Sequence, residues 1–321
     1  MMTDNELLNV SGSKPTGARI KVRVPGTSAN CGPGFDCLGL ACSVYNDLEL
    51  MLLKEPKLIV ETVGEGADSI PTDDKNIVWR SIKILLDRAK FSDEFKGAVI
   101  KMENHIPMSR GLGSSAAAIV AGLKAANAIV GSPFNRQELL QLATDIEGHP
   151  DNVAPALLGG FTVSVVNYGK VQTLSFLPKI TMNFVLAVPD FPLPTWQARQ
   201  VLPKDVPMKD AIFNISRASM LVAALIKGKD RFFKNVFDDA IHQPYRKGLI
   251  PGLKEAIDSA RKVGAIGAAL SGAGPSVIAF TIEKQHNAND IASAMTQAFA
   301  SKGVNAKSMI LKLDTRGAHI I

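Results

Sequence analysis

The chain has 321 residues, which is long enough for a large core and for two domains. Hydrophobic residues make up 46% and charged residues 21%, and the net charge of +6 comes without a basic run dense enough for nucleic-acid binding. No stretch approaches the roughly 20 apolar residues that a membrane span needs. We therefore expect neither a nucleic-acid-binding nor a membrane-spanning protein.

The N-terminal region and the cysteines indicate the compartment. Residues 1–16 are polar, without an apolar segment like that of a secretion signal, so we expect a flexible lead-in. Cys31, Cys37 and Cys42 are odd in number and close together, which argues against a disulfide framework and for a reducing compartment. A metal site is the alternative, but no histidine or carboxylate cluster completes a ligand set. We expect a cytoplasmic protein.

The first half of the chain predicts strands followed by helices. Segments rich in β-branched residues and bounded by turn residues indicate strands at 20–24, 48–53, 58–63 and 98–103. Helical periodicity then covers 116–130 and 136–147, and a glycine follows each segment. A further strand is expected at 161–166.

The second half mixes the two kinds of element. Strands are expected at 183–188, 276–282 and 309–313, and helices at 213–226, 251–263 and 290–301. Residues 189–207 contain five prolines and cannot form one regular element. The elements do not alternate as in a doubly wound sheet, so the sequence predicts an α+β fold with domains at 1–180 and 181–321.

The strongest chemical signal is a glycine-rich turn that leads into the helix expected at 116–130. Gly111 and Gly113 allow a close approach of the backbone, and Ser114 and Ser115 stand where N-cap hydroxyls belong. The free N–H groups and the positive end of the helix dipole then favour a bound phosphate. The candidate phosphate-binding residues are Pro107, Ser109, Arg110, Gly111, Leu112, Gly113, Ser114, Ser115 and Ala116.

The glycines of this turn also suggest three other kinds of site or structure. Its letters Gly-Leu-Gly-Ser-Ser-Ala match a dinucleotide fingerprint, but no strand directly precedes them and no suitable acidic residue follows about 20 residues on. A Walker loop is excluded because no Lys-Ser or Lys-Thr pair follows the glycines. A capped helix without a ligand remains open, although two glycines and two serines exceed what a cap needs.

This turn resembles the phosphate-binding motif of the GHMP kinases, and two more glycine-rich motifs, at 25–39 and 270–276, match the family in order. The resemblance covers residues 19–320. It implies a two-domain GHMP kinase fold, with an N-terminal domain like ribosomal protein S5 domain 2 and a ferredoxin-like C-terminal domain. It also implies ATP as co-substrate, and a third turn over the site formed by Gly272, Gly274 and Ser276.

Within the family the motifs at 27–36, 149–155, 195–203 and 244–251 are most similar to those of homoserine kinases. The resemblance implies ATP-dependent phosphorylation of the hydroxyl group of L-homoserine to O-phospho-L-homoserine, in threonine biosynthesis. The residues that it places around the substrate are Asn30, Asp36, Asn152, Thr195, Arg199 and Arg246. An arginine suits a carboxylate because its planar group donates two parallel hydrogen bonds.

Other roles depend on ligand chemistry and on the same resemblance. Mg²⁺ prefers hard oxygen ligands, which Ser115 and Glu147 can supply together with the phosphates. Asn76 and Val78 resemble the segment beside the adenine. His149 lies in a Gly-His-Pro turn and needs no catalytic role, because positioning can carry phosphoryl transfer without a base. Homodimers are common in the family, although the sequence itself does not indicate the oligomeric state.

Two alternatives remain. One is another GHMP enzyme, either a kinase of the mevalonate or sugar type or a diphosphomevalonate decarboxylase. The other is a non-catalytic ligand-binding protein on the same fold. The presence of both Ser115 and Glu147 argues against the second, because a decayed kinase tends to lose its metal ligands.

Overall fold

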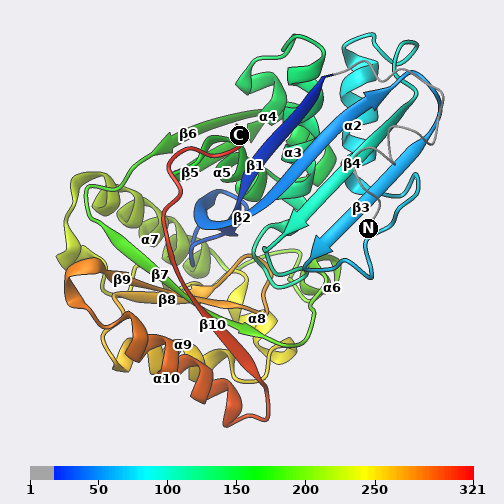
Figure 1. Cartoon of the computed structure of the whole chain (residues 1–321). Coiled ribbons are helices and arrows are strands. Elements are labelled where there is room, and N and C mark those ends of the chain that lie inside the picture. The colour runs from blue at the N-terminus through cyan, green and yellow to red at the C-terminus, as the bar shows by residue number, and fades with distance from the viewer. Residues whose placement is uncertain (1–17) are drawn as a thin grey trace.

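The computed structural model describes residues 18–321, so the expectation for residues 1–16 lies outside the described part. It contains two β-sheets (Figure 1). The first has seven strands, in the order β11–β1–β2–β4–β3, with β5 pairing to β2 and β6 to β5. These strands are β1 (Arg19–Ala29), β2 (Leu38–Leu53), β3 (Leu58–Gly64), β4 (Gly97–Asn104), β5 (Phe161–Asn167), β6 (Lys170–Phe176) and β11 (His319–Ile320).

The second sheet has four antiparallel strands in the order β10–β7–β9–β8. They are β7 (Met182–Pro189), β8 (Gly267–Leu270), β9 (Val277–Ile282) and β10 (Ala306–Lys312). This order, with helices before β8 and before β10, is that of a split β-α-β-β-α-β unit, and it confirms the expected ferredoxin-like arrangement. All four strands of this sheet come after residue 180 in the chain, whereas β11, near the C-terminus, pairs with the first sheet.

Helices cover the sheets (Figure 1). Those beside the first sheet are α2 (Ile77–Arg88), α3 (Ser114–Ile129), α4 (Arg136–Glu147) and α5 (Pro150–Leu158). The connection from β7 to β8 contains α6 (Thr195–Gln200), α7 (Met208–Lys227), α8 (Gln243–Arg246) and α9 (Leu253–Lys262), and α10 (Ala288–Ala300) precedes β10. Short 3₁₀ turns cover Asp230–Phe232, Lys247–Leu249 and Glu283–Gln285. No helix of residues 18–321 is both long and apolar enough to cross a membrane.

Strand β7 shows how the core is divided. Phe184 and Leu186 join a large apolar cluster that extends through the first sheet, whereas Val185 and Ala187 join a smaller cluster under α9 and α10. Successive side chains of a strand point to opposite faces, which explains the alternation. The large cluster continues through Phe280, whose ring stacks on that of Phe237 at 4.3 Å between centroids. One core therefore links the two sheets around the site described below.

Some expected boundaries were wrong. The segment expected as a turn at 25–39 is strand up to Ala29 and again from Leu38, so only the residues between them form the turn. Pro25 can lie inside β1 because β11 pairs only with Val22 and Arg23, which leaves this edge of β1 open where the proline lacks an N–H group. The register shift between Pro25 and Gly26 then redirects the strand toward the site.

Two helices beside the site were not expected. Helix α2 begins directly after Asn76, within a segment that was interpreted only as a nucleotide contact. Helix α5 begins at Pro150 and contains Pro155, and prolines usually argue against a helix. Pro150 is tolerated because the first N–H group of a helix has no partner in any case. The proline-rich stretch 189–207 is not one regular element, as expected, and contains only the short α6.

Candidate functional site

A cavity of about 360 Å³ lies where the three glycine-rich segments meet. Most of the residues proposed from the sequence line it, from both halves of the chain. They are Asn30, Asp36, Asn76, Val78, Ser109, Gly111, Leu112, Gly113, Ser114, Ser115, Glu147, Asn152, Thr195, Arg199, Arg246, Gly272 and Gly274. The proposed residues that do not line it are Pro107, Arg110, Ala116 and Ser276.

The first wall of the cavity is the start of helix α3. Gly113 is the N-cap and adopts a left-handed conformation with φ of 67°, and no side chain caps the helix. The expectation that Ser114 and Ser115 supply N-cap hydroxyls was wrong, because both lie inside the first turn. The first helical hydrogen bond runs from the Ala117 N–H to the Gly113 carbonyl oxygen. The preceding N–H groups are therefore without acceptors in the helix and can bind an anion.

The two glycines of this turn pack against protein. A Cβ atom at Gly111 would lie 2.1 Å from the Ser271 carbonyl oxygen, and one at Gly113 would lie 1.9 Å from Thr27 Oγ1. The Ser271 hydroxyl also lies 2.6 Å from the Gly111 carbonyl oxygen and 2.8 Å from Ser28 Oγ. The close approach that the sequence assigned to a ligand is thus also an approach of the three motifs to one another.

Of the proposed residues outside the cavity, Arg110 makes hydrogen bonds within the protein, whereas Ser276 is buried without one for its hydroxyl in the described part of the chain. The Arg110 guanidinium donates to the carbonyl oxygens of Pro189 at 2.8 Å, Asp190 at 2.8 Å and Met108 at 3.1 Å. It thereby fixes the phosphate-side turn to the end of β7. Ser276 is buried, and its hydroxyl has no hydrogen-bond partner among residues 18–321.

Ser115, in the first turn of α3, and Glu147, the last residue of α4, are in contact at the edge of the cavity. The Ser115 hydroxyl donates to Glu147 Oε2 at 3.0 Å. Burial raises the pKa of Glu147, although the charge of His149 and the bond from Ser115 act against the shift. A poorly hydrated carboxylate beside a hydroxyl oxygen offers the hard ligands that Mg²⁺ takes. The residues present therefore fit this ion.

A histidine and an aspartate that the sequence left without a role also line the cavity. His149 Nδ1 lies 2.5 Å from Oδ1 of the buried Asp151. Burial lowers the pKa of His149, but the hydrogen bond and the charge of Asp151 outweigh it, so the pKa is raised. One possible ligand atom each from Asp36, His149 and Asp151 lies within 4.8 Å of the others. The signal in the sequence was the His-x-Asp spacing at the start of α5.

A second wall of the cavity carries charged side chains. Arg199 donates to both carboxylate oxygens of Asp36, at 2.7 and 3.0 Å. Burial lowers the pKa of Arg199, but the bonds to Asp36 outweigh it and the pKa is raised. Thr195 and Arg199 both lie on α6, four residues apart, which places them on the same face of that helix. The aspartate and the arginine present one negative and one positive group to the same space.

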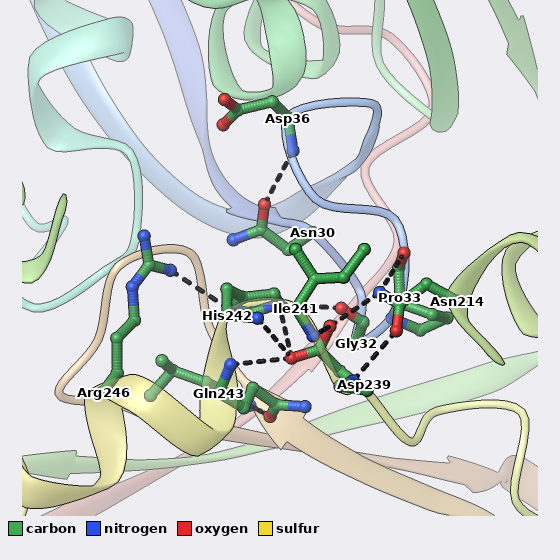
Figure 2. A network of polar contacts seen from close by, with 12 residues as sticks. Asn30, Gly32, Pro33, Asp36, Asn214, Asp239, Ile241, His242, Gln243 and Arg246 are labelled. Atoms are coloured by element: carbon green, nitrogen blue, oxygen red, sulfur yellow. Dashed lines mark hydrogen bonds and ion pairs between the residues drawn. The ribbon is translucent and has the colours of Figure 1, made fainter. Parts of the chain in front are cut away.

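Arg246 is the largest of the fully buried side chains in residues 18–321, with 1% of its surface exposed. Its guanidinium donates to the carbonyl oxygens of Ala198 and Gly272, both at 3.1 Å. It also donates to His242 Nδ1 at 3.2 Å (Figure 2). Burial lowers its pKa to about 10, and Arg199 adds to the shift. The Phe35 ring lies 5.4 Å from this guanidinium and 5.5 Å from that of Arg199. One ring therefore stands beside both cations.

Three asparagines hold the walls in place. Asn30 donates to the Gly272 carbonyl oxygen at 2.9 Å and accepts from the Asp36 N–H at 3.1 Å. Asn152 accepts from Thr27 Oγ1 at 2.8 Å. Asn76 is fully buried and caps α2 by accepting from the N–H groups of its second and third residues. The side chain proposed for adenine is thus a helix cap, while its residue and Val78 still line the cavity.

Two protein-family models match the chain. One describes the N-terminal domain of GHMP kinases and matches residues 76–160, and the other describes their C-terminal domain and matches residues 220–301. A homoserine kinase of Carboxydothermus hydrogenoformans is 44% identical over 298 residues, which are 92% of this chain and 95% of that protein. A homoserine kinase of Desulfitobacterium hafniense is 41% identical and covers 94% and 100%.

Solved structures are similar over almost the whole chain. The crystal structure of homoserine kinase from Cytophaga hutchinsonii has a TM-score of 0.86 with 29% identity, and covers 96% of this chain and 99% of that one. Mevalonate kinase of L. major, in complex with R-mevalonate, has a TM-score of 0.70 with 18% identity, and covers 95% and 99%. The second likeness concerns the fold alone.

Proposed function

The chain belongs to the GHMP kinase family, and we infer that it is a homoserine kinase, which transfers the γ-phosphoryl group of ATP to the hydroxyl of L-homoserine. The observation that carries this inference is one cavity with two kinds of wall. One wall is a helix N-terminus that suits phosphates, and the other offers Asp36 and two arginines to a zwitterion. Relatives at 41–44% identity over more than nine tenths of the chain support the same reaction.

On the phosphate side, we propose that the turn ending at Gly113 holds the triphosphate. The free N–H groups at the start of α3 would donate to the phosphate oxygens, and the positive end of the helix dipole would favour their charge. Because these groups belong to the backbone, they are in place before ATP arrives. Such preorganised donors lower the cost of stabilising charge in the transition state.

We propose Ser115 and Glu147 as the protein ligands of Mg²⁺. Their oxygens are already 3.0 Å apart, and burial makes the carboxylate costly to ionise unless a cation is near. An ion held by Ser115 and Glu147 would supply positive charge against the negative charge that develops on the phosphate oxygens. Glu147 keeps its oxygen toward that position through the hydroxyl of Ser115.

On the amino-acid side, we propose that the substrate replaces an internal ion pair. Without substrate, Arg199 and Asp36 satisfy each other. Homoserine brings an ammonium group for Asp36 and a carboxylate for Arg199 and Arg246, so no charge is left buried and unpaired after the exchange. A ligand with only one of these charges would leave one partner of the pair unsatisfied. This exchange favours an amino acid over mevalonate or a sugar.

We propose that the transfer needs no dedicated general base. The transition state of phosphoryl transfer is loose, so positioning and charge stabilisation supply most of the rate. His149 is held by Asp151 with a raised pKa, which leaves less of the neutral form that a base requires. In this proposal the ion pair of His149 and Asp151 supports the start of α5, and Asn152 contacts the substrate.

A coupled ADP-release assay over L-homoserine, mevalonate, galactose and shikimate tests the assignment. We expect turnover with homoserine far above that with the other three. Strong turnover of mevalonate without turnover of homoserine would overturn the substrate. No ADP release with any hydroxyl compound would favour a ligand-binding protein on the kinase fold.

We also propose that two copies of the chain associate through helix α7. Its outer face is apolar where a solvent-facing helix is normally polar. Met208 is 76% exposed, Ile212 59%, Ile215 66% and Ile226 42%. The spacings of four, three and eleven residues continue one heptad-like stripe, which the same stripe on a second copy can match around a two-fold axis.

Sedimentation velocity tests this association. We expect a dimer for the unchanged protein and a monomer for Ile215→Lys, while Ile320→Lys, at an exposed residue of β11 in the first sheet, keeps the dimer. A monomer at every concentration of the unchanged protein would contradict the proposal.

We also propose a cytoplasmic location, which is supported by three cysteines that are all free thiols.

A further inference from the structure

A buried polar network lies behind the amino-acid wall, and it joins three segments that are far apart in the sequence (Figure 2). They are the turn after β1, helix α7 and the segment from Asp239 to Arg246. Asp239 and His242 have no exposed side-chain surface. Burying such groups is costly unless each of their hydrogen-bonding atoms finds a partner, and both side chains do find partners here.

Asp239 fixes the start of helix α8. Its Oδ1 accepts from Asn214 Nδ2 at 2.7 Å and from the Ile241 N–H at 3.0 Å. Its Oδ2 accepts from the N–H groups of His242 at 3.0 Å and Gln243 at 2.7 Å. Four donors therefore compensate the buried carboxylate. They also hold the first turn of a helix that ends at Arg246.

His242 connects the network to the arginine. Its Nε2 lies 2.8 Å from the Gly32 carbonyl oxygen, which can only accept a hydrogen bond. Its Nδ1 lies 3.2 Å from Nη1 of Arg246, which can only donate. Both contacts are made together only by the neutral ring that carries its proton on Nε2. The ring also stacks on Phe35, at 5.2 Å between centroids.

The charges around His242 agree with this neutral form. The groups that face it are Asp239, whose Oδ2 lies 3.5 Å from Nε2, and the charged ends of Arg246 and Asp36. Burial lowers the pKa of His242 most, Asp239 opposes the shift, and Arg246 adds to it. The net direction is down, so the ring is neutral at pH 7. Protonation would turn Nδ1 into a donor that faces a guanidinium.

We propose that His242 is a positioning residue that sets the distance between the carboxylate-binding Arg246 and the ammonium-binding Asp36, and so helps to select an α-amino acid as acceptor. One ring holds the arginine through Nδ1 and the turn that carries Asp36 through Gly32. The same turn is tied to Arg246 again at the Gly272 carbonyl oxygen, which accepts from Asn30 as well. This inference rests on the proposed function.

Three substitutions separate the two bonds of the ring. His242→Asn keeps an acceptor near the place of Nδ1, His242→Gln keeps a donor near the place of Nε2, and His242→Leu removes both. We expect His242→Leu to raise the homoserine KM about tenfold to a hundredfold, which is the range for the loss of an outer partner that orients a metal ligand. The KM for ATP should stay within about twofold, because no contact of the phosphate wall changes.

The conservative variants and a control sharpen this result. His242→Asn should recover most of the homoserine KM, and His242→Gln should recover less, because only the first keeps the acceptor for Arg246. His286→Asn, at an exposed histidine of the same half of the chain, should change neither KM. An unchanged homoserine KM in His242→Leu, or an equal rise in both KM values, would overturn the proposal.

A second measurement uses the unchanged protein and does not depend on how the variants fold. Nitrogen-15 NMR of the imidazole groups should show one histidine with its proton on Nε2, neutral from pH 8 down to below 6.5. A charged ring at neutral pH, or a proton on Nδ1, would overturn the inference. Failure of the proposed function and failure of this inference can be told apart. If the unchanged protein does not turn over homoserine, the proposed function is contradicted. If it turns over homoserine normally and His242 is charged, only the role of His242 is contradicted.

Discussion

The two walls of the cavity are built in opposite ways. The phosphate wall comes from one continuous segment, the turn before α3 and the first turn of that helix, and it presents backbone N–H groups. The amino-acid wall presents charged side chains from segments far apart, such as Asp36 and Arg199, which are separated by 163 positions. Backbone donors are fixed by local structure, whereas the charged groups depend on the packing of both sheets.

This difference predicts which substitutions each wall tolerates. On the phosphate wall a change of backbone conformation should do more harm than the loss of most side chains. On the amino-acid wall the reverse should hold, because Asp36 and Arg199 are paired with each other and the loss of one side chain leaves the other without its ionic partner. The network around His242 belongs to the second kind, since it holds a side chain through other side chains.

Glu147→Gln should have the largest effect, since Glu147 is the exception on the phosphate side, a charged side chain among backbone donors. We expect kcat to fall about a hundredfold to a thousandfold, as when one preorganised electrostatic group is removed from an active site. Steady-state kinetics over a range of Mg²⁺ concentrations would measure this, with Glu138→Gln on the same helix as control. An unchanged kcat at low Mg²⁺ would remove Glu147 from the metal site.

Arg246→Ala should come next and should act on one substrate only. Loss of a charge-assisted bond to the homoserine carboxylate should raise the homoserine KM about a hundredfold, with a much smaller change in the KM for ATP. The matched control is Arg231→Ala, at a residue that does not line the cavity. If both KM values rose together, Arg246 would be supporting the fold rather than binding the substrate.

Gly111→Ala tests the backbone of the phosphate wall. A Cβ atom there would lie 2.1 Å from the Ser271 carbonyl oxygen, whereas one at Gly131 would meet nothing within 4 Å, and both glycines have positive φ. We expect Gly131→Ala to lower the free energy of unfolding by about 1 kcal/mol, from the left-handed conformation alone. Gly111→Ala should lower it by about 3 kcal/mol, because strain and clash add. Equal losses in urea unfolding would mean that the turn can relax.

The difference between a wall made of local backbone and a wall made of distant side chains also explains which parts of the site the sequence predicted well. The phosphate turn was found from adjacent residues, because glycines before an apolar helix are a local pattern with a local cause. Its cap was misassigned, since only the φ of Gly113 shows that the glycine itself ends the turn. Most strands of both sheets were placed, although β1 and β2 run further into the site than periodicity shows.

The amino-acid wall could not be derived in this way. Arg199 and Arg246 were singled out only through motifs that resemble a family, and nothing near either residue in the chain points to Asp36. His242 and Asp239 were missed altogether, because a buried network becomes visible only when α7, the turn after β1 and α8 are placed together. Helix α5 was hidden by its two prolines, and with it the approach of Asp151 to His149.

His149→Gln should have the smallest effect on catalysis, less than about tenfold in kcat, if positioning replaces a base. It should alter stability instead. Because the folded-state pKa of His149 is raised, its pair with Asp151 contributes stability that is fully present below pH 6.5 and is lost as the pH rises through the folded pKa. Urea unfolding at pH 6 and pH 9 would show this difference in the unchanged protein and not in the variant. A loss of kcat above a thousandfold would make His149 the base.

The most direct test of the charged wall changes the substrate and leaves the protein intact. Kinetics would compare L-homoserine with 4-hydroxybutyrate, which lacks the ammonium group, and with 3-amino-1-propanol, which lacks the carboxylate. If the zwitterion replaces the ion pair of Asp36 and Arg199, each analogue leaves a charge unpaired, and kcat/KM should fall at least about a thousandfold. Comparable turnover of either analogue and homoserine would contradict this exchange.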